Sequence, residues 1–329
     1  MPNRGLLVYT WMFLIPGAVA ATQQQPSPPP PPLAADSLIV RVLDVGQGDA
    51  IYVANGSSRA IIDGGPSAAT FGRYLDSLGL NNSTIDVVIV SHAHLDHYLG
   101  LRELFRTSRN IRVRYFFENK DLSAAVTLAR LRDSILARMD RDSLVYRDTD
   151  DPCSNGASIC TIAMAGGAKL HIMRPQQNAT SQNNRSVPVK LVGPDSASFT
   201  MWLAGDAEHS ALRWFDSAGY ASDPGMSVSV LKADHHGSCN GVTDRYLALT
   251  SPSWVIASLG AGNGYGHMHT QAKAVYRRNR VPWYRTDLNG SVTIVAPGAP
   301  SSGFTVTPER GRASLSGRSD RRSTQRQCR

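Results

Sequence analysis

Short runs of alternating apolar and polar residues begin near residue 38, and longer stretches between them repeat apolar residues at helical spacing. The alternating runs predict strands over 38–43, 50–54, 60–63, 86–91, 169–173, 187–192, 199–204, 227–232, 253–259 and 291–295. The helical spacing predicts helices over 70–78, 97–105, 121–139, 208–218, 242–249 and 270–279, with a loop over 140–165. Because two β-rich blocks each contain helices, we expect an α/β fold (α+β four-layer αββα sandwich): two packed mixed sheets with helices outside.

The N-terminal segment differs from the rest of the chain. Residues 1–20 are typical of an export signal peptide, with Arg4, an apolar run over 6–15 and small residues at Ala18-Val19-Ala20. The apolar run is too short to span a bilayer, so we expect no membrane-spanning segment in the mature chain. The alternatives are an uncleaved single anchor or a misassigned start codon.

Composition also sets the expected domain boundaries. Residues 21–37 are rich in Pro, which favours an extended linker. Residues 301–329 are rich in Arg, Ser and Gly, and we expect them to form a disordered basic tail. A single folded domain is predicted over 38–300, in an exported protein that is periplasmic or extracellular.

The basic charge of the chain is concentrated in its tail. The formal net charge is +8, from 34 Lys plus Arg and 26 Asp plus Glu. Seven Arg and two acidic residues fall in 308–329, and Arg4 is in the signal segment, which leaves 26 basic and 24 acidic residues for 21–307. A net +2 over the body gives little support to nucleic-acid binding through a long basic face.

The four cysteines are too few for a disulfide scaffold. Cys153 and Cys160 flank a short, turn-rich loop, and in an exported chain a disulfide between them would persist. We therefore predict that bond, whereas the sequence does not assign Cys239 or Cys328.

The strongest chemical signal is the segment Ser91-His92-Ala93-His94-Leu95-Asp96-His97, which follows the apolar run at 85–90. It places three imidazoles and a carboxylate within six residues, and these are donors that suit borderline divalent metals. Burying four such side chains at a strand end without compensation would be costly. We therefore expect Zn²⁺ as the cofactor, one or two ions, with Mn²⁺ as the alternative.

Further motifs follow in a recognisable order. They are Leu43-Asp44-Val45-Gly46-Gln47-Gly48-Asp49-Ala50, Ile62-Asp63-Gly64-Gly65, Leu203-Ala204-Gly205-Asp206-Ala207-Glu208, Leu231-Lys232-Ala233-Asp234-His235-His236-Gly237-Ser238 and Tyr265-Gly266-His267. Together with the histidine motif, this set resembles the metallo-β-lactamase-fold hydrolases. More narrowly, it is similar to the soluble hydrolase domain of ComEC-type competence DNA-uptake channels, over residues 38–296.

The resemblance implies a set of metal ligands. His92 and His94 would hold one metal, Asp96 and His97 would hold a second, and Asp206 would bridge the two. A carboxylate can bridge because each of its oxygens can accept a separate bond. Asp96 also counts among the expected catalytic residues. The alternative for Asp206 is an N-cap of the following helix, since Asp is a good N-cap.

The last metal ligand is left open by the sequence. His235 and His236 are adjacent at an expected strand end, so their side chains should point to opposite faces. We favour His236 as the ligand and His235 as a group that contacts substrate or donates a proton. His267 is a third candidate for the ligand or for catalysis. Lys232 is expected to offer its charge to a phosphate, or else to be an ordinary surface lysine.

Other positions have supporting roles or depart from the family pattern. Asp63 is expected to hold a metal-binding histidine by its second nitrogen. The wider family has another metal-binding histidine between Asp96 and Asp206, and this chain has Asn183-Asn184-Arg185-Ser186 there. We expect His171 and His269 to be structural or on the surface, which leaves one metal short of a protein ligand.

Three functions are compatible with these residues. The first is an exported metal-dependent hydrolase, a phosphodiesterase or nuclease that uses a metal-bound hydroxide, with nucleic acid, lipid or wall polymer as the phosphodiester-containing substrate. The second is a hydrolase of β-lactams, lactones or thioesters. The third is a non-catalytic binding module associated with the envelope. The sequence does not indicate the oligomeric state.

Overall fold

The computed structural model describes residues 36–119, 126–195, 199–298 and 303–313. Cys328, the expected signal peptide over 1–20 and most of the expected linker lie outside these residues, so the expectations for the two segments stay predictions. Within the described ranges, no helix is both long enough and apolar enough to cross a membrane.

The first sheet contains eight strands among the described residues, in the order β15-β14-β1-β2-β3-β4-β5-β6. Their bounds are β1 Leu38–Val42, β2 Ala50–Asn55, β3 Ser58–Gly64, β4 Thr84–Ile89, β5 Arg112–Glu118, β6 Val145–Asp148, β14 Val292–Ala296 and β15 Thr305–Pro308. The sheet is mixed: β1, β2, β14 and β15 pair antiparallel with their neighbours, whereas β3 to β6 run parallel.

The second sheet contains seven strands in the same described part, in the order β13-β12-β11-β10-β9-β8-β7. Their bounds are β7 Ile159–Ala163, β8 Lys169–Met173, β9 Val189–Val192, β10 Thr200–Leu203, β11 Val230–Lys232, β12 Trp254–Ala257 and β13 Trp283–Arg285. Strands β10 to β13 are parallel, and β7 to β10 are antiparallel. Both sheets therefore have a parallel part, and the loops at the carboxyl ends of such strands commonly bind ligands.

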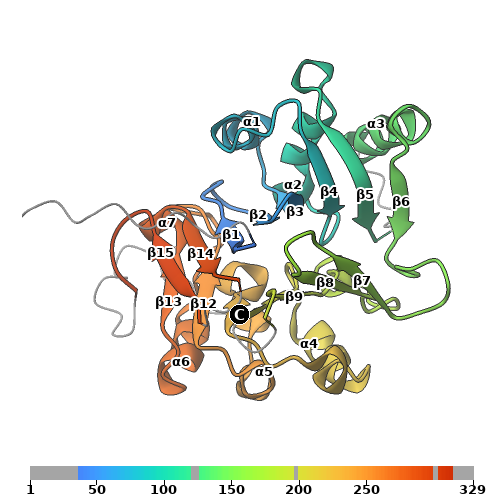
Figure 1. Cartoon of the computed structure of the whole chain (residues 1–329). Coiled ribbons are helices and arrows are strands. Elements are labelled where there is room, and N and C mark those ends of the chain that lie inside the picture. Colours follow the sequence, from blue (N-terminus) through green and yellow to red (C-terminus); the bar gives the residue numbers. More distant parts are fainter. Residues whose placement is uncertain (1–35, 120–125, 196–198, 299–302, 314–329) are drawn as a thin grey trace, which may run out of the picture. The chain divides into compact units, whose positions relative to one another are not determined.

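The helices of the described ranges are α1 Ala68–Ser77, α2 Leu95–Tyr98, α3 Val126–Asp142, α4 His209–Ser217, α5 Asp244–Thr250, α6 Thr270–Arg278 and α7 Thr286–Asn289. The longer helices α1, α3, α4, α5 and α6 lie outside the two sheets (Figure 1). Side chains cap two of them: the Ser67 hydroxyl accepts from the Thr70 amide at the start of α1, and the Thr243 hydroxyl accepts from the Tyr246 amide at the start of α5.

Three apolar clusters define the layers. The central cluster joins residues of both sheets, such as Val40 and Ile62 of the first and Leu191 and Met201 of the second, so the sheets pack face to face. A second cluster lies between the outer face of the first sheet and α1 and α3, and a third between the second sheet and α4, α5 and α6. The predicted four-layer sandwich, two packed mixed sheets with helices outside, is confirmed.

Several strands were not predicted. Strand β5 has Arg112 and Arg114 within its first half, and these charges interrupt the apolar run that the prediction relied on. Strands β6 and β7 fall in the expected loop over 140–165, and both are short with few buried positions. Strand β15 pairs with β14 inside the stretch expected to be a tail from residue 301. Its four residues are partly or fully exposed, so no apolar pattern marks it, and the folded part continues beyond residue 300.

The predicted disulfide joins the loop after β6 to strand β7. Cys153 and Cys160 are bonded, with their Cα atoms 5.0 Å apart. The bond closes a short surface loop at the end of the second sheet, far along the chain from the histidine motif.

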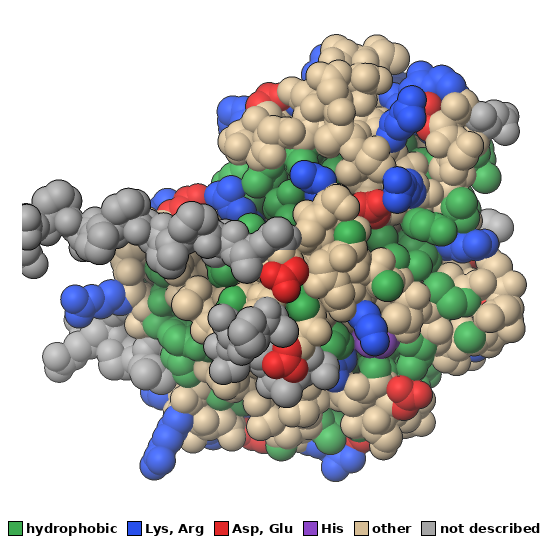
Figure 2. All heavy atoms as spheres, in the orientation of Figure 1, with side chains coloured by type: hydrophobic (Ala, Val, Ile, Leu, Met, Phe, Trp, Pro, Cys, Tyr) green, Lys and Arg blue, Asp and Glu red, His purple; other side chains and the backbone are tan. Residues whose placement is uncertain are grey.

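Basic side chains are scattered over the surface in view. Figure 2 shows Lys and Arg spread among polar and apolar residues on this face, without one continuous band. This distribution agrees with the small net charge expected for residues 21–307.

The segment that follows the histidine motif is held against the end of β3 by a close backbone approach. After α2 the chain continues as a 3-10 helix over Leu99–Phe105, where a single helix over 97–105 was expected. The Gly100 amide donates to the Gly65 carbonyl over 3.0 Å. A methyl group on Gly100 would overlap the Gly64 carbonyl oxygen, so only glycine allows this approach.

We expect Gly100→Ala to lower the free energy of unfolding by about 1–3 kcal/mol, because the added methyl must push two backbone segments apart. Gly264→Ala is the matched control: a methyl there meets no heavy atom within 4 Å, and its stability should change by less than about 0.5 kcal/mol. Urea unfolding measures both. Equal stability of the two variants would contradict the close approach.

Candidate metal centre

Three loops bring the predicted ligands together, and each follows a strand in the parallel part of a sheet. The loop after β4 carries residues 91–97, the loop after β10 carries Asp206, and a 3-10 turn over Asp234–Gly237 follows β11. Because these strands belong to two packed sheets, residues more than a hundred positions apart meet at one edge of the sandwich.

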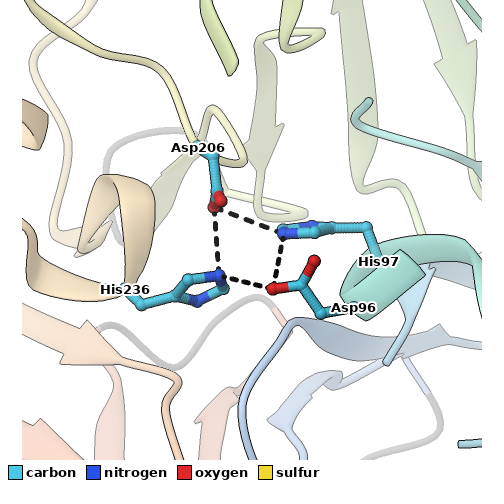
Figure 3. A group of neighbouring side chains, drawn as sticks. All are labelled: Asp96, His97, Asp206 and His236. Atoms are coloured by element: carbon cyan, nitrogen blue, oxygen red, sulfur yellow. Dashed lines mark ion pairs between the residues drawn. The ribbon is translucent and has the colours of Figure 1, made fainter. Parts of the chain in front are cut away.

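Four side chains form the first group: Asp96, His97, Asp206 and His236 (Figure 3). The Asp206 Oδ1 atom lies 3.3 Å from His97 Nε2 and 3.3 Å from His236 Nε2. Asp96 Oδ2 lies 3.4 Å from His236 Nε2 and 4.0 Å from His97 Nε2. Two oxygens and two nitrogens therefore face one point, in numbers that suit a four-coordinate divalent cation.

Three side chains form the second group: His92, His94 and Asp206. His92 Nε2 lies 3.0 Å from His94 Nδ1 and 3.8 Å from Asp206 Oδ2. Asp206 thus turns one oxygen toward each group. This is the position of a bridging carboxylate, and it agrees with the arrangement that the resemblance implied. The alternative of Asp206 as a helix cap is wrong, because α4 begins at His209 and its N-cap is Glu208.

Three of the four donor atoms of the first group face only other atoms of that group in the described part of the chain. His97 Nε2, His236 Nε2 and Asp206 Oδ1 are buried, and no hydrogen bond to a described residue satisfies them. An unsatisfied buried polar group costs about 1–3 kcal/mol. A bound cation would satisfy all three atoms at once, so the residues present fit a metal ion.

Contacts behind the ligands fix how the imidazoles are oriented. His97 Nδ1 lies 2.9 Å from Asp63 Oδ2, and His236 Nδ1 lies 2.8 Å from the Ser258 carbonyl oxygen. In each case Nδ1 donates its proton, which leaves Nε2 free to bind a metal. The expected role of Asp63 therefore agrees with its contacts. Asp63 has φ 59°, a left-handed conformation that few non-glycine residues adopt.

The carboxylates also control protonation of the centre. Burial alone would lower the pKa of His97 and of His236, but Asp206, with Asp63 beside His97 and Asp49 beside His236, raises both pKa values well above normal. For Asp206, burial would raise the pKa, but the two imidazoles hold it well below normal. Without a cation the group therefore retains protons, so a metal must displace them when it binds.

The adjacent histidines occupy a turn rather than the expected strand end. His235 and His236 have φ values of 46° and 54°, both in the left-handed region. The turn sends His236 into the first group, whereas His235 lies on the side of Glu208. We expected His236 to face the metal and His235 to face elsewhere, and the placement agrees with this. The reason given, that side chains alternate along a strand, is wrong because the two residues lie in a turn.

His235 has a carboxylate partner that the sequence did not reveal. Its Nδ1 atom lies 3.1 Å from Glu208 Oε1, and its Nε2 atom lies 3.8 Å from Asp206 Oδ2. The same Glu208 oxygen accepts from the side-chain amide nitrogens of Asn183 and Asn240 over 3.0 and 2.9 Å. The one feature of the sequence that could have indicated this role is the position of Glu208, two residues after Asp206.

Members of both groups line an open cavity of about 1060 Å³, whereas His92 and His97 are fully buried and outside its lining. Its lining comprises Gln47, His94, Asp96, Asn183, Asp206, His235, His236, Ser238, Asn240, Gly264, Tyr265, His267 and His269. No Lys or Arg belongs to this set. Negative charge on a substrate would therefore have to be neutralised by a bound cation or by imidazoles.

Lys232 is not placed to meet a phosphate. It is 1% exposed, and its ammonium lies 2.5 Å from Asp49 Oδ2 and 3.3 Å from the Gly205 carbonyl oxygen. Burial would lower the pKa of Lys232, but Asp49 and Asp206 outweigh it and raise the pKa. The ammonium therefore lies beneath the cavity as the partner of a buried carboxylate, and both expected roles, phosphate contact and surface lysine, need correcting.

The remaining histidines have different places. His267 lines the cavity, and its ring centroid lies 5.2 Å from that of His235, but it is in neither metal group. His269 also lines the cavity, and its Nδ1 accepts from the Cys239 amide over 3.1 Å, which is a structural contact. His171 lies on β8, hydrogen-bonded to Thr161, away from the cavity. The second group accordingly has no third histidine.

Comparison with known families agrees with this geometry. Residues 43–115 match the family model described as the metallo-beta-lactamase superfamily. The matched segment includes Asp63 and the whole histidine motif. The match covers less than a quarter of the chain, and members of that superfamily are generally metal-dependent hydrolases. The two packed mixed sheets with outer helices are consistent with the metallo-beta-lactamase α/β sandwich fold.

Solved structures give matches of low sequence identity. The metallo-beta-lactamase fold protein YhfI from Bacillus subtilis is 13% identical, with a TM-score of 0.46 over 73% of this chain and 93% of its own. Igni18, a metallo hydrolase from Ignicoccus hospitalis, is 14% identical, with a TM-score of 0.47 over 78% and 98%. The short form of human tRNase Z is 13% identical, with a TM-score of 0.44 over 68% and 93%. No curated protein matches the chain.

We expect Lys232→Met to destabilise the protein by about 3–5 kcal/mol, because it leaves the Asp49 carboxylate buried without its cation. Adding Asp49→Asn should restore part of the loss, since the uncompensated charge is then gone. Thermal unfolding of the single and double variants measures this. A stable Lys232→Met variant with altered phosphate binding would instead support the original expectation for Lys232.

Proposed function

We propose that this protein is an exported, metal-dependent phosphodiesterase. The observation that carries the proposal is the position of Asp206, whose two oxygens face two separate donor groups at the floor of an open cavity. A metal pair about 3.5–4 Å apart suits phosphodiester hydrolysis because it can activate water and offset charge on the phosphoryl oxygens. The ions would be Zn²⁺ or Mn²⁺, held by His92, His94 and Asp206 on one side and by Asp96, His97, Asp206 and His236 on the other.

The protein's own residues would position the substrate and move a proton. His235 Nε2 faces the cavity beside Asp206, and Glu208 Oε1 lies 3.1 Å from Nδ1 of the same ring. The hydrogen bond from His235 lowers the pKa of Glu208, so its carboxylate stays ionised. In this arrangement His235 donates a proton from Nε2 to the leaving oxygen, and Glu208 stabilises the charged imidazole and fixes its orientation.

Two finer assignments belong to the same proposal. The order of the motifs, from Asp49 through Asp63, the histidine motif, Asp206 and the two adjacent histidines, supports a place near the ComEC-type hydrolase domains. The signal-like composition of residues 1–20 and the disulfide between Cys153 and Cys160 support export to the periplasm or the medium.

The two donor groups should bind metal with different affinities. The group with four protein donors should bind its first ion at least about ten-fold more tightly than the group with three. Titration with Zn²⁺ or Mn²⁺, followed by isothermal calorimetry, measures both steps. His236→Ala should remove the tight step, whereas His94→Ala should keep it and remove the weak one.

His171→Ala is the matched control for these variants, since it removes a histidine outside the cavity and should leave both steps intact. Loss of the tight step in His94→Ala, or two equal steps in the unaltered protein, would contradict the ranking of the two groups.

The effect of removing His235 should depend on whether the leaving group of the substrate needs a proton. The metal-loaded protein should cleave bis-p-nitrophenyl phosphate and single-stranded DNA. We expect His235→Gln to slow DNA cleavage by about 10²–10⁴-fold, because the sugar oxygen needs a proton to leave. The same variant should hydrolyse bis-p-nitrophenyl phosphate nearly normally, since p-nitrophenolate leaves as a stable anion. Steady-state rates on both substrates measure the contrast.

Metal content of each variant must be equal for this comparison, and His171→Ala again serves as the control. Absence of turnover with either metal would sink the proposal. Hydrolysis of nitrocefin that is lost in His94→Ala, without phosphodiester cleavage, would favour the alternative β-lactam, lactone or thioester hydrolase. An intact chain that binds no transition metal would favour the non-catalytic module.

A further inference from the structure

An exposed aromatic ring stands at the edge of the cavity. Tyr265 is 65% exposed and belongs to the cavity lining. Among the described residues only three other large apolar side chains are exposed to a similar degree: Leu95, Val126 and Leu136. Tyrosine has an apolar ring and a polar hydroxyl, and it is enriched at binding interfaces.

The ring is supported from one side. The imidazole of His267 lies almost parallel to the Tyr265 ring, with a centroid distance of 5.5 Å and an interplanar angle of 20°. His267 is itself 4% exposed, so it forms a fixed base for the tyrosine. Because one face of the phenol lies on His267, the exposed area belongs to the opposite face and to the edges. A second planar ring could stack there.

The loop that carries Tyr265 is held in place by hydrogen bonds. The side-chain amide nitrogen of Asn263 donates to the Gly260 and His267 carbonyl oxygens over 3.0 and 2.8 Å. Its Oδ1 atom accepts from the backbone amide of His267. His269 Nε2 lies 3.2 Å from the Tyr265 carbonyl oxygen. A loop fixed in this way presents the ring before substrate arrives, so less ordering is needed on binding.

The rest of the cavity narrows the choice of ligand. Among the described residues, its lining contains imidazoles, amides, a hydroxyl and the carboxylates of Asp96 and Asp206, but no Lys or Arg. Such walls do not neutralise a row of phosphates, so a long polyanion gains little beyond the phosphate at the metal centre. They suit a ligand that has one phosphate at the metals and a planar ring beside it.

We propose that Tyr265, supported by His267, is a stacking platform for the nucleobase next to the phosphate that the metal centre binds. The inference rests on the proposed phosphodiesterase function and narrows its substrate class to nucleotide phosphodiesters in single strands or short fragments. Lipid and wall-polymer phosphodiesters have no planar ring at this place, so they would not use the platform. Base–aromatic stacking is tolerant of sequence, so the platform reads the presence of a base and not its identity.

The test compares two short single-stranded oligonucleotides on the metal-loaded full chain. Both have phosphorothioate linkages that slow hydrolysis, and one has abasic residues with the same backbone charge. Fluorescence anisotropy should show that Tyr265→Ala weakens binding of the base-containing oligonucleotide by about 5- to 150-fold. The abasic oligonucleotide should bind weakly to the unaltered protein, and Tyr265→Ala should not change that binding.

Two further variants separate stacking from other effects. Tyr265→Phe keeps the ring and should bind like the unaltered protein. Leu136→Ala removes an exposed apolar side chain on α3, outside the cavity lining, and should also bind normally. Equal loss for both oligonucleotides in Tyr265→Ala, or equal binding of the two by the unaltered protein, would overturn the inference.

The outcomes for the inference and for the proposed function are distinguishable. Turnover of bis-p-nitrophenyl phosphate with no base-dependent binding would keep the phosphodiesterase and reject the platform, which points to lipid or wall-polymer substrates. Base-dependent binding through Tyr265 with no turnover would support the platform and reject the catalytic proposal.

Discussion

The shared carboxylate of Asp206 is the constraint on which the site depends. Its two oxygens face two groups of histidines, and it is almost completely buried. A buried carboxylate is stable only with compensating positive charge, which here comes either from protonated His97 and His236 or from a cation. The fold supplies this arrangement by packing two sheets so that the loops after β4, β10 and β11 end at one edge. The class of the fold and the chemistry of its centre are therefore consequences of one geometry.

Much of the architecture was accessible from the sequence, and the exceptions have physical reasons. Buried strands with β-branched residues, such as β1 and β4, gave clear patterns. Strands at sheet edges or with charges on their exposed face, such as β5 and β15, gave none, because only tertiary pairing makes them strands. The four-layer order followed from the alternation of blocks, but the pairing of β1 with β14 across the whole chain did not.

The candidate site shows the same division. The residues from His92 to His97 could be predicted as metal ligands from the sequence, because so many metal-binding side chains this close together seldom have another role. Lys232 was misjudged because its partner, Asp49, is far away in sequence, and burial cannot be read from one lysine in an apolar strand. Glu208 and Tyr265 were present in quoted motifs but had no assigned role. Their roles depend on neighbours, His235 and His267, that only the fold brings into contact.

Counting charge at the centre explains why a second cation and an anionic substrate belong together. Lys232 offsets Asp49, and burial raises the pKa of Asp234 well above normal, which keeps that acid neutral. Apart from Glu208, which faces His235, three carboxylates then remain beside the donors: Asp63, Asp96 and Asp206. One divalent cation leaves this set with net negative charge, which repels a phosphodiester. A second cation reverses the sign. Because the described part of the cavity lining contains no Lys or Arg, that reversal would be the main source of attraction for a phosphate in the proposed function. The group with only three protein donors is thus suited to an ion whose remaining coordination is supplied by the substrate itself.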